Sequence, residues 1–243
     1  MKKQIKLKFK RKGNVISFKK FTDEENLVWK RLCERQLKNL KGKASKIRVE
    51  GWKRLKMDTK NVPDFEKLNK ILKKFGGWEV VMTNIQYEEG VAWVTALNEK
   101  KFRVTDYIRE SKNLGFTPLP DIFHDVFGHV PFFTIPQYSR IVHKFGMAIT
   151  QAKTKKMKDF ITNNWWYALE FSLIRENGKL KALGTGLVSS GNELKNALSS
   201  RVQKLPYDPL VAGHTPKNPH EMHKTLFVLE SLDQLEAAVD GWL

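Results

Sequence analysis

The chain of 243 residues is short of cysteine and has no long hydrophobic run. Cys33 is its single cysteine, which excludes an internal disulfide and is typical of a reducing compartment. No stretch of about 18 uncharged apolar residues occurs, so a membrane-spanning helix is excluded. Residues 1–20 alternate basic with apolar residues and lack the continuous apolar core of a signal peptide. We therefore expect a cytoplasmic protein with no membrane partner.

Basic residues are concentrated in the first third of the chain. Residues 1–74 hold 25 Lys/Arg against 8 Asp/Glu, and they carry nearly all of the formal net charge of +18. Such an excess can bind phosphate polymers, so a basic nucleic-acid-binding protein is one functional hypothesis. A solvated basic surface is the interpretation we favour, because no recognised nucleic-acid module accompanies the charge.

The apolar content of 41% suits a globular protein, and neither a repeat nor a linker-like tract divides the chain. Alternation around Lys12-Gly13 predicts a basic β-hairpin or extended arm over residues 1–21. For the remainder, residues 22–243, we expect one domain that is mainly α, or α+β by strict count, with small β elements.

Helix signals are clear at several places. Thr22 to Glu25 is a capping box, and Asp64 opens a second helix that Gly76-Gly77 ends. The apolar spacing also predicts helices over residues 158–175 and, at the end of the chain, over residues 221–239. Glu176-Asn177-Gly178 predicts a turn into a short strand.

Two histidines in an apolar segment are the first candidates for chemistry. His124 and His129 lie five residues apart, which on an ideal α-helix leaves their side chains about 140° from each other. They can share a metal only if the helix ends or bends between them, and Gly128 and Pro131 are residues that allow this. The alternative is a pair of core imidazoles bonded to the backbone.

A lone carboxylate, Glu170, stands among aromatic and aliphatic residues and is expected to be buried. Burial is costly unless the group binds a metal or an arginine, and the candidate arginines are Arg109, Arg140 and Arg175. Two histidines and a carboxylate suit non-haem Fe(II) oxygen chemistry or catalytic zinc. The zinc-protease motif His-Glu-x-x-His is absent, and residue types alone leave iron and zinc both open.

Arg109 lies fifteen residues before His124. Its guanidinium, held by Asp121, is suited to a forked grip on a substrate carboxylate. A surface salt bridge of little energetic value is the alternative.

These residues also resemble those of a known family. Pro120-Asp121-Ile122-Phe123-His124-Asp125-Val126-Phe127-Gly128-His129-Val130-Pro131 is similar to the signature Pro-Asp-x-x-His-Glu-x-x-Gly-His-x-Pro of the pterin-dependent aromatic amino acid hydroxylases, and particularly of the bacterial phenylalanine 4-monooxygenases. The order and spacing of further motifs agree with the family, namely Tyr107-Ile108-Arg109, Thr117-Pro118, residues 166–171 and residues 184–190. The resemblance runs from about Thr22 to the end of the chain.

The resemblance implies a hydroxylase-type catalytic domain and a role for each matching residue. His124, His129 and Glu170 would bind ferrous iron. The amino-acid end of the substrate would be held by Arg109, Asp121, Thr117 and Ser189, and its ring by Pro118, Trp166 and Phe171. Trp93 would stack on a tetrahydropterin, either tetrahydrobiopterin or a related pterin, and Asp125 would contact it. Glu193 matches an acidic position in a supporting role.

The activity implied is ring hydroxylation of a free aromatic amino acid with O₂ as co-substrate, phenylalanine to tyrosine first and tryptophan as the alternative. Asp125 stands where the family signature has Glu, and residues 83–90 replace the Gly-Leu-containing pterin loop of relatives, so the pterin contacts are expected to differ. We expect a monomer or weak dimer.

Overall fold

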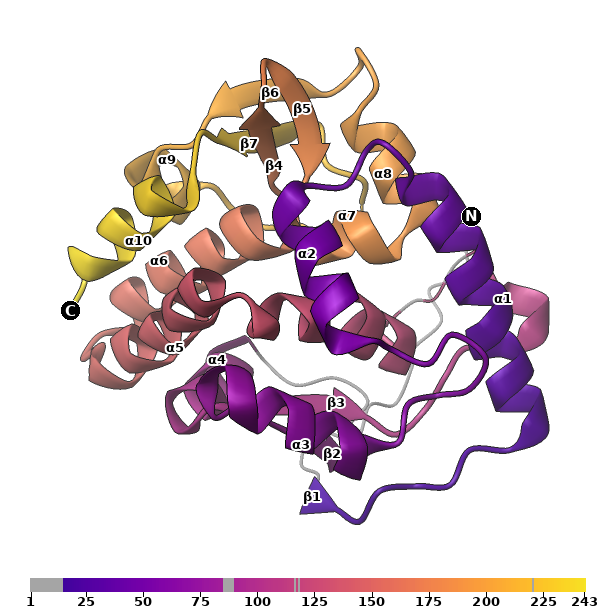
Figure 1. Ribbon diagram of the computed structural model, residues 1–243. Helices are drawn as coiled ribbons and strands as arrows, with labels where there is room; N and C mark the ends of the chain where they lie inside the picture. The colour runs from indigo at the N-terminus through magenta and orange to yellow at the C-terminus, as the bar shows by residue number, and fades with distance from the viewer. Residues whose placement is uncertain (1–14, 85–89, 116, 118, 220) are drawn as a thin grey trace, which may run out of the picture.

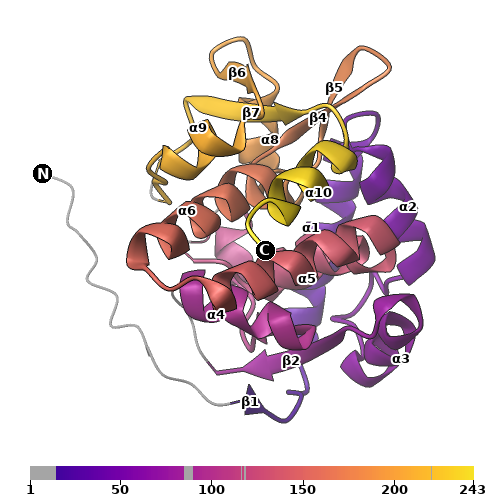
Figure 2. The same ribbon diagram turned by 90° about the vertical axis from the view of Figure 1, so that its left-hand side faces the viewer.

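The computed structural model describes residues 15–84, 90–115, 117, 119–219 and 221–243. A three-stranded sheet lies at one end of the molecule and a four-stranded sheet at the other, with α5 (Pro136–Gln151) and α6 (Lys155–Trp165) between them (Figures 1 and 2). The long buried side chains of this middle layer, such as Phe145 and Ile149, join both ends into one core.

Helices make up most of the described structure, as the sequence predicts. The other α-helices are α1 (Asp23–Leu40), α2 (Lys46–Leu55), α3 (Phe65–Gly76), α4 (Gly90–Ala96), α7 (Thr185–Ser189), α8 (Gly191–Ala197), α9 (Pro209–His214) and α10 (Leu232–Asp240). Short 3₁₀ helices are η1 (Leu97–Glu99), η2 (Ser111–Asn113) and η4 (Val130–Thr134). Two segments are π-helical, η3 (Phe123–His129) and η5 (Trp166–Glu170).

The two sheets are small. The first has the order β1-β2-β3, from β1 (Val15–Ile16), β2 (Glu79–Thr83) and β3 (Lys101–Thr105). The second has the order β5-β4-β7-β6, from β4 (Leu173–Glu176), β5 (Lys179–Ala182), β6 (Gln203–Pro206) and β7 (Thr225–Leu229). β7 lies inside this sheet and pairs in parallel with both neighbours.

The predicted helix ends have a clear chemical basis. Thr22 caps α1 in a complete capping box, and Asp64 accepts hydrogen bonds from two backbone amides at the start of α3. Gly77 ends α3 with a φ of +74°, a conformation that glycine adopts without strain. Asn177 and Gly178 both have positive φ and form the tight turn between β4 and β5.

Two helix predictions are wrong in part. Residues 173–176 form β4 rather than the end of a helix, and residues 225–229 form β7 rather than the start of α10. Leu226 and Leu229 are buried in the sheet, and their spacing of three fits a helix only by chance. α10 begins after Ser231, which caps it.

Only the end of the predicted arm can be described. β1 pairs antiparallel with β2, while the first strand of the predicted hairpin and its turn lie outside the described residues. The division into an arm (1–21) and a domain (22–243) stays a prediction. Over the described ranges, no helix combines the length and apolar character that crossing a bilayer requires.

Candidate metal centre

His124 and His129 lie on η3, and the π-helix brings them together. Because a π-helix closes i→i+5 hydrogen bonds, residues five apart lie above one another rather than on different faces. The two Nε2 atoms are 3.3 Å apart. The expectation that the helix must end or bend between them is therefore wrong: it is wound more widely instead, and it changes to the 3₁₀ helix η4 at Val130-Pro131.

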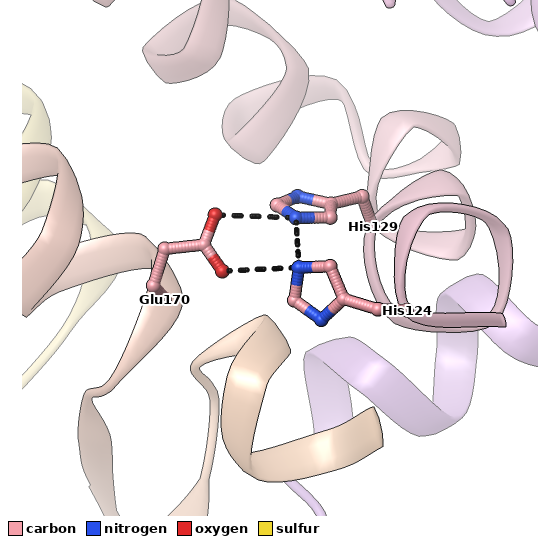
Figure 3. Close-up of side chains that lie close together, drawn as sticks. All are labelled: His124, His129 and Glu170. Carbon is pink, nitrogen blue, oxygen red and sulfur yellow. Dashed lines mark hydrogen bonds and ion pairs between the residues drawn. The ribbon is translucent and has the colours of Figure 1, made fainter. Parts of the chain in front are cut away.

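Glu170 is the last residue of η5, the second π-helical segment. Its carboxylate reaches the two imidazoles across the molecule: Oε1 lies 3.2 Å from Nε2 of His129, and Oε2 lies 3.7 Å from Nε2 of His124 (Figure 3). The arginines that were alternative partners pair elsewhere, Arg109 with Asp121, Arg140 with Glu236 and Arg175 with Glu230. Glu170 is thus buried beside the histidines and not in an arginine salt bridge.

Hydrogen bonds fix the tautomer of His124. Ser189 Oγ donates to the carbonyl oxygen of Thr185, so at its 2.9 Å contact with His124 the hydroxyl oxygen accepts from Nδ1–H. The lone pair of Nε2 then faces Glu170 and His129. Burial lowers the pKa of His124 to about 4, which keeps this imidazole neutral and able to bind a cation.

The Glu170 carboxylate is ionised and oriented. Burial alone would raise its pKa, but the two histidines and the Thr185 hydroxyl lower the pKa to about 2. Trp165 Nε1 donates to Oε1 over 3.0 Å, and Thr185 Oγ1 donates to Oε2. Each oxygen therefore has one fixed donor as well as an imidazole neighbour.

This donor set fits one divalent ion. One ligand atom from each of His124, His129 and Glu170 lies within 4.8 Å of the others. Two donors bound about 90–110° apart, at the roughly 2.1 Å bond length of imidazole and carboxylate ligands, are separated by about 3–3.5 Å. Two imidazoles and one carboxylate on one side of an ion leave its other side open, as non-haem Fe(II) oxygenases require.

Arg109 and Asp121 are in contact, as predicted. Nε and Nη2 of Arg109 donate to the two Asp121 oxygens over 2.7 and 2.8 Å, and Asp121 is fully buried. Asp121 also accepts from the backbone N–H of His124, 3.2 Å away, which ties the guanidinium to the start of η3. The pair is a buried fork rather than the surface salt bridge that was the alternative.

Trp166 and Phe171 lie against each other, with ring centroids 4.6 Å apart. His223, which the sequence did not single out, stacks on Phe171 at 4.1 Å and accepts a 2.8 Å hydrogen bond from Trp166 Nε1. Burial lowers the pKa of His223 to about 4, so its ring is neutral at pH 7. The three rings form an aromatic wall to which Phe171, the residue after Glu170, belongs.

Trp93 lies near the centre, and Asp125 lies on η3 between the two histidines. Trp93 packs edge-on against Trp165 at 4.9 Å and lies 5.6 Å from His129, centroid to centroid. Asp125 accepts a 2.9 Å hydrogen bond from the backbone N–H of Thr105, and burial raises its pKa to about 7. Asp125 therefore links η3 to the end of β3.

The remaining candidate site residues are Thr117, Pro118 and Glu193. Thr117 donates to the carbonyl oxygen of Leu119 over 2.6 Å, and Pro118 lies outside the described residues. Glu193 lies in the first turn of α8, where its backbone N–H donates to the Ser190 cap, and burial raises the pKa of its carboxyl. The roles of all these residues stay predictions.

Two partners of Glu170 were missed from the sequence. Thr185 lies in a segment that carried the family resemblance, but its own position gave no sign of a role. Trp165 had a usable signal: it precedes Glu170 by five residues, the same interval that separates the two histidines.

Comparisons with known proteins define the class. A family model described as biopterin-dependent aromatic amino acid hydroxylase matches residues 1–243, and the chain belongs to this family. It is therefore an enzyme of the aromatic amino acid monooxygenase class. The zinc hydrolase and the nucleic-acid-binding protein, the two alternatives from the sequence, do not belong to that class.

Individual relatives carry more specific names than the family does. Phenylalanine-4-hydroxylase of Chromobacterium violaceum is 32% identical over 217 residues, which is 89% of this chain and 73% of that protein. Phenylalanine-4-hydroxylase of Mesorhizobium japonicum is 31% identical over 220 residues, 90% of this chain and 79% of that protein. A crystal structure of the C. violaceum enzyme with iron(III) and 7,8-dihydrobiopterin has a TM-score of 0.86 at 30% identity and covers 91% of this chain and 81% of that one.

Proposed function

We propose that this chain is a non-haem iron, tetrahydropterin-dependent monooxygenase that hydroxylates free phenylalanine to tyrosine. The observation that carries the proposal is the convergence of His124, His129 and Glu170 in a member of this family. The relatives named above act on phenylalanine, and one of them is known with iron and a biopterin bound.

The oxidant would be O₂, which bound ferrous iron would activate, and the tetrahydropterin would supply two of the electrons that reduce it. One oxygen atom would be inserted into a ring C–H bond to give a C–OH group, and the other would remain on the pterin as a hydroxyl group. The chain itself has to hold three ligands on one side of the iron and to exclude bulk water. The burial of His129 and Glu170 and the aromatic rings around them serve the second purpose.

The substrate would be held at both ends. The Arg109 guanidinium, fixed by Asp121, would bind the substrate carboxylate, assisted by Thr117 and Ser189. The wall of Trp166 and Phe171, completed by Pro118, would receive the aromatic ring. Because the Asp121 carboxylate also bonds to the backbone of His124, the distance between carboxylate grip and metal is fixed by one short segment.

The pterin, tetrahydrobiopterin or a related compound, would lie on the side of Trp93 and Asp125. Trp93 offers an aromatic face beside His129, and Asp125 offers a carboxyl group at the start of η3. The segment that replaces the pterin loop of relatives lies largely outside the described residues, at 85–89. A cytoplasmic location and a monomeric or weakly dimeric state are further expectations of the proposal.

The test is reconstitution of the purified protein with Fe(II) under anaerobic conditions, followed by a tetrahydropterin, O₂ and one of phenylalanine, tryptophan or tyrosine. Chromatography of the products is expected to show tyrosine from phenylalanine, at a rate well above hydroxylation of the other two. Hydroxytryptophan as the main product would favour the tryptophan alternative, and no pterin-dependent product at all would refute the proposal. Replacing His124 or Glu170 by alanine is expected to abolish iron binding and turnover.

A further inference from the structure

Arg48 is a buried cation without a carboxylate partner in the described structure. Arg48 is 2% exposed, and its guanidinium lies against the rings of Trp52 and Phe127, 4.8 Å from each centroid. Nε and Nη1 are buried with no hydrogen-bond acceptor. Burial lowers the pKa of Arg48 to about 9, so the group is still charged at pH 7. An apolar side chain of similar length would cost less here, which suggests that the charge has a specific task.

The one hydrogen bond of this guanidinium ends on the π-helix that carries both histidines. Nη2 donates to the carbonyl oxygen of Phe127 over 2.9 Å, and Phe127 stands between His124 and His129. In an α-helix that carbonyl would accept from the backbone N–H of residue 131, but residue 131 is proline and has none. Arg48 supplies a charged donor in its place.

Arg48 lies on α2, and this helix contacts η4, the 3₁₀ helix that follows η3, at two more points. A Cβ atom on Gly51 would lie 2.2 Å from the Pro131 carbonyl oxygen, so only glycine allows this close approach. One turn further, Nη1 of Arg54 donates to the carbonyl oxygen of Thr134 over 3.0 Å. α2 thus holds the place where the π-helix η3 passes into the 3₁₀ helix η4.

The helical winding at this junction determines whether the side chains of His124 and His129 lie close together. With α-helical winding, residues five apart point about 140° away from each other, and only the wider π winding aligns them. A π-helix is rare and needs support from its surroundings. Loss of the bond to Phe127 would remove a support within two residues of His129.

We propose that Arg48 is a positioning residue for the metal centre: by holding the Phe127 carbonyl it keeps η3 in the π form and the two histidine Nε2 atoms side by side. The inference rests on the proposed function, because it assumes that these histidines bind a metal. Among the described residues, Arg48 has no hydrogen bond or ring contact with a candidate ligand or with a predicted substrate-binding residue.

The test compares Arg48→Met, which keeps length and bulk but removes the donor, with Val239→Ala, a buried change in α10. Two properties are measured, the affinity of each protein for Co²⁺ by absorbance titration and the deuterium exchange of backbone amides in the metal-free proteins. Thermal midpoints show whether each variant is folded.

Arg48→Met is expected to keep or raise the thermal midpoint, to weaken Co²⁺ binding about tenfold and to speed amide exchange within residues 123–131. Val239→Ala is expected to lower the midpoint and to leave both other properties within twofold of the parent protein. Wild-type Co²⁺ affinity and exchange in folded Arg48→Met would overturn the inference.

If Arg48→Met does not fold, the same criteria apply to Arg48→Leu, which also removes the donor to the Phe127 carbonyl. Failure of the inference is distinguishable from failure of the proposed function. If the parent protein itself binds no Co²⁺, the metal centre is wrong; if the parent binds it and the variant binds it equally well, only the role of Arg48 is wrong.

Discussion

Each oxygen of the Glu170 carboxylate accepts a hydrogen bond from a side chain that is not a candidate ligand. Trp165 Nε1 donates to one and Thr185 Oγ1 to the other. Such donors orient a metal ligand, and their loss commonly costs 10–100-fold in metal affinity. They also satisfy a buried carboxylate, which in the described structure has no arginine or lysine beside it.

Replacing Thr185 by valine removes the hydroxyl but keeps the shape of the side chain. We expect Thr185→Val to weaken Co²⁺ or Fe²⁺ binding about tenfold, because one carboxylate oxygen loses its donor. Thr185→Ser, which keeps the hydroxyl, is the matched control and should bind nearly as tightly as the parent protein. Equal affinities of the two variants in a metal titration would show that the hydroxyl does not orient Glu170.

Arg109 contributes through its forked geometry and not only its charge. Arg109→Lys is expected to raise the KM for phenylalanine tenfold or more, since a charged hydrogen bond contributes about 1.5–3 kcal/mol and lysine cannot reproduce the fork. The control is Arg140→Lys at an exposed ion pair, which should leave KM unchanged. Metal affinity should stay within twofold in both variants, and an unchanged KM in Arg109→Lys would count against the grip.

Most residues of the metal centre could be identified from the sequence, but their arrangement in space could not. Two histidines and an isolated carboxylate stand out chemically in their apolar segments. The π-helical winding that aligns the histidines depends on contacts with other elements, such as the one from Arg48, and local sequence patterns do not reveal these. His223 was missed for the same reason, because it comes from a segment more than fifty residues after Trp166.

At the scale of elements, local helix signals succeeded, whereas β4 and β7, the two inner strands of the four-stranded sheet, were taken for helix. Capping residues announced α1 and α3, since a cap acts within three or four residues. β7 was taken for a helix because a strand buried inside a sheet reads as a continuous apolar run without alternation. Its parallel partners lie far away along the chain, where no pattern over a few residues can find them.

The packing of α7 on the segment after Glu170 leaves little free space. A Cβ atom on Gly186 would lie 2.7 Å from the Phe171 ring and 3.1 Å from the carbonyl oxygen of Glu170. Gly186→Ala is therefore expected to displace the Phe171 ring and to raise the KM for phenylalanine about tenfold, with a smaller change in metal affinity.

Gly115→Ala is the control, because a Cβ atom there meets nothing within 4 Å. Steady-state kinetics on both variants check the prediction. Unaltered kinetics in Gly186→Ala would mean that the Phe171 ring is not part of the substrate pocket.

At the scale of the whole molecule, the neutral form of His223 links stability to pH. Its pKa is lowered to about 4 by burial, whereas an exposed histidine titrates near 6.5. Between these values the unfolded chain binds the proton more readily, so the free energy of unfolding falls as the pH is lowered from about 6.5 toward 4. Once protonated, Nε2 of His223 could no longer accept the hydrogen bond from Trp166 Nε1.

His223→Gln is expected to make the free energy of unfolding less dependent on pH in this window. Denaturant titrations at several pH values measure it, with the exposed His214→Gln as control. If the parent protein and His223→Gln lose stability equally on acidification, His223 is not held neutral by the fold.

The account as a whole depends on one ion being bound by residues from two π-helical segments. Anomalous X-ray diffraction from crystals grown with Fe(II) under anaerobic conditions tests this most directly. We predict a single strong iron peak at bonding distance from Nε2 of His124, Nε2 of His129 and a carboxylate oxygen of Glu170. Iron bound elsewhere, or full occupancy retained in the Glu170→Ala protein, would contradict the account.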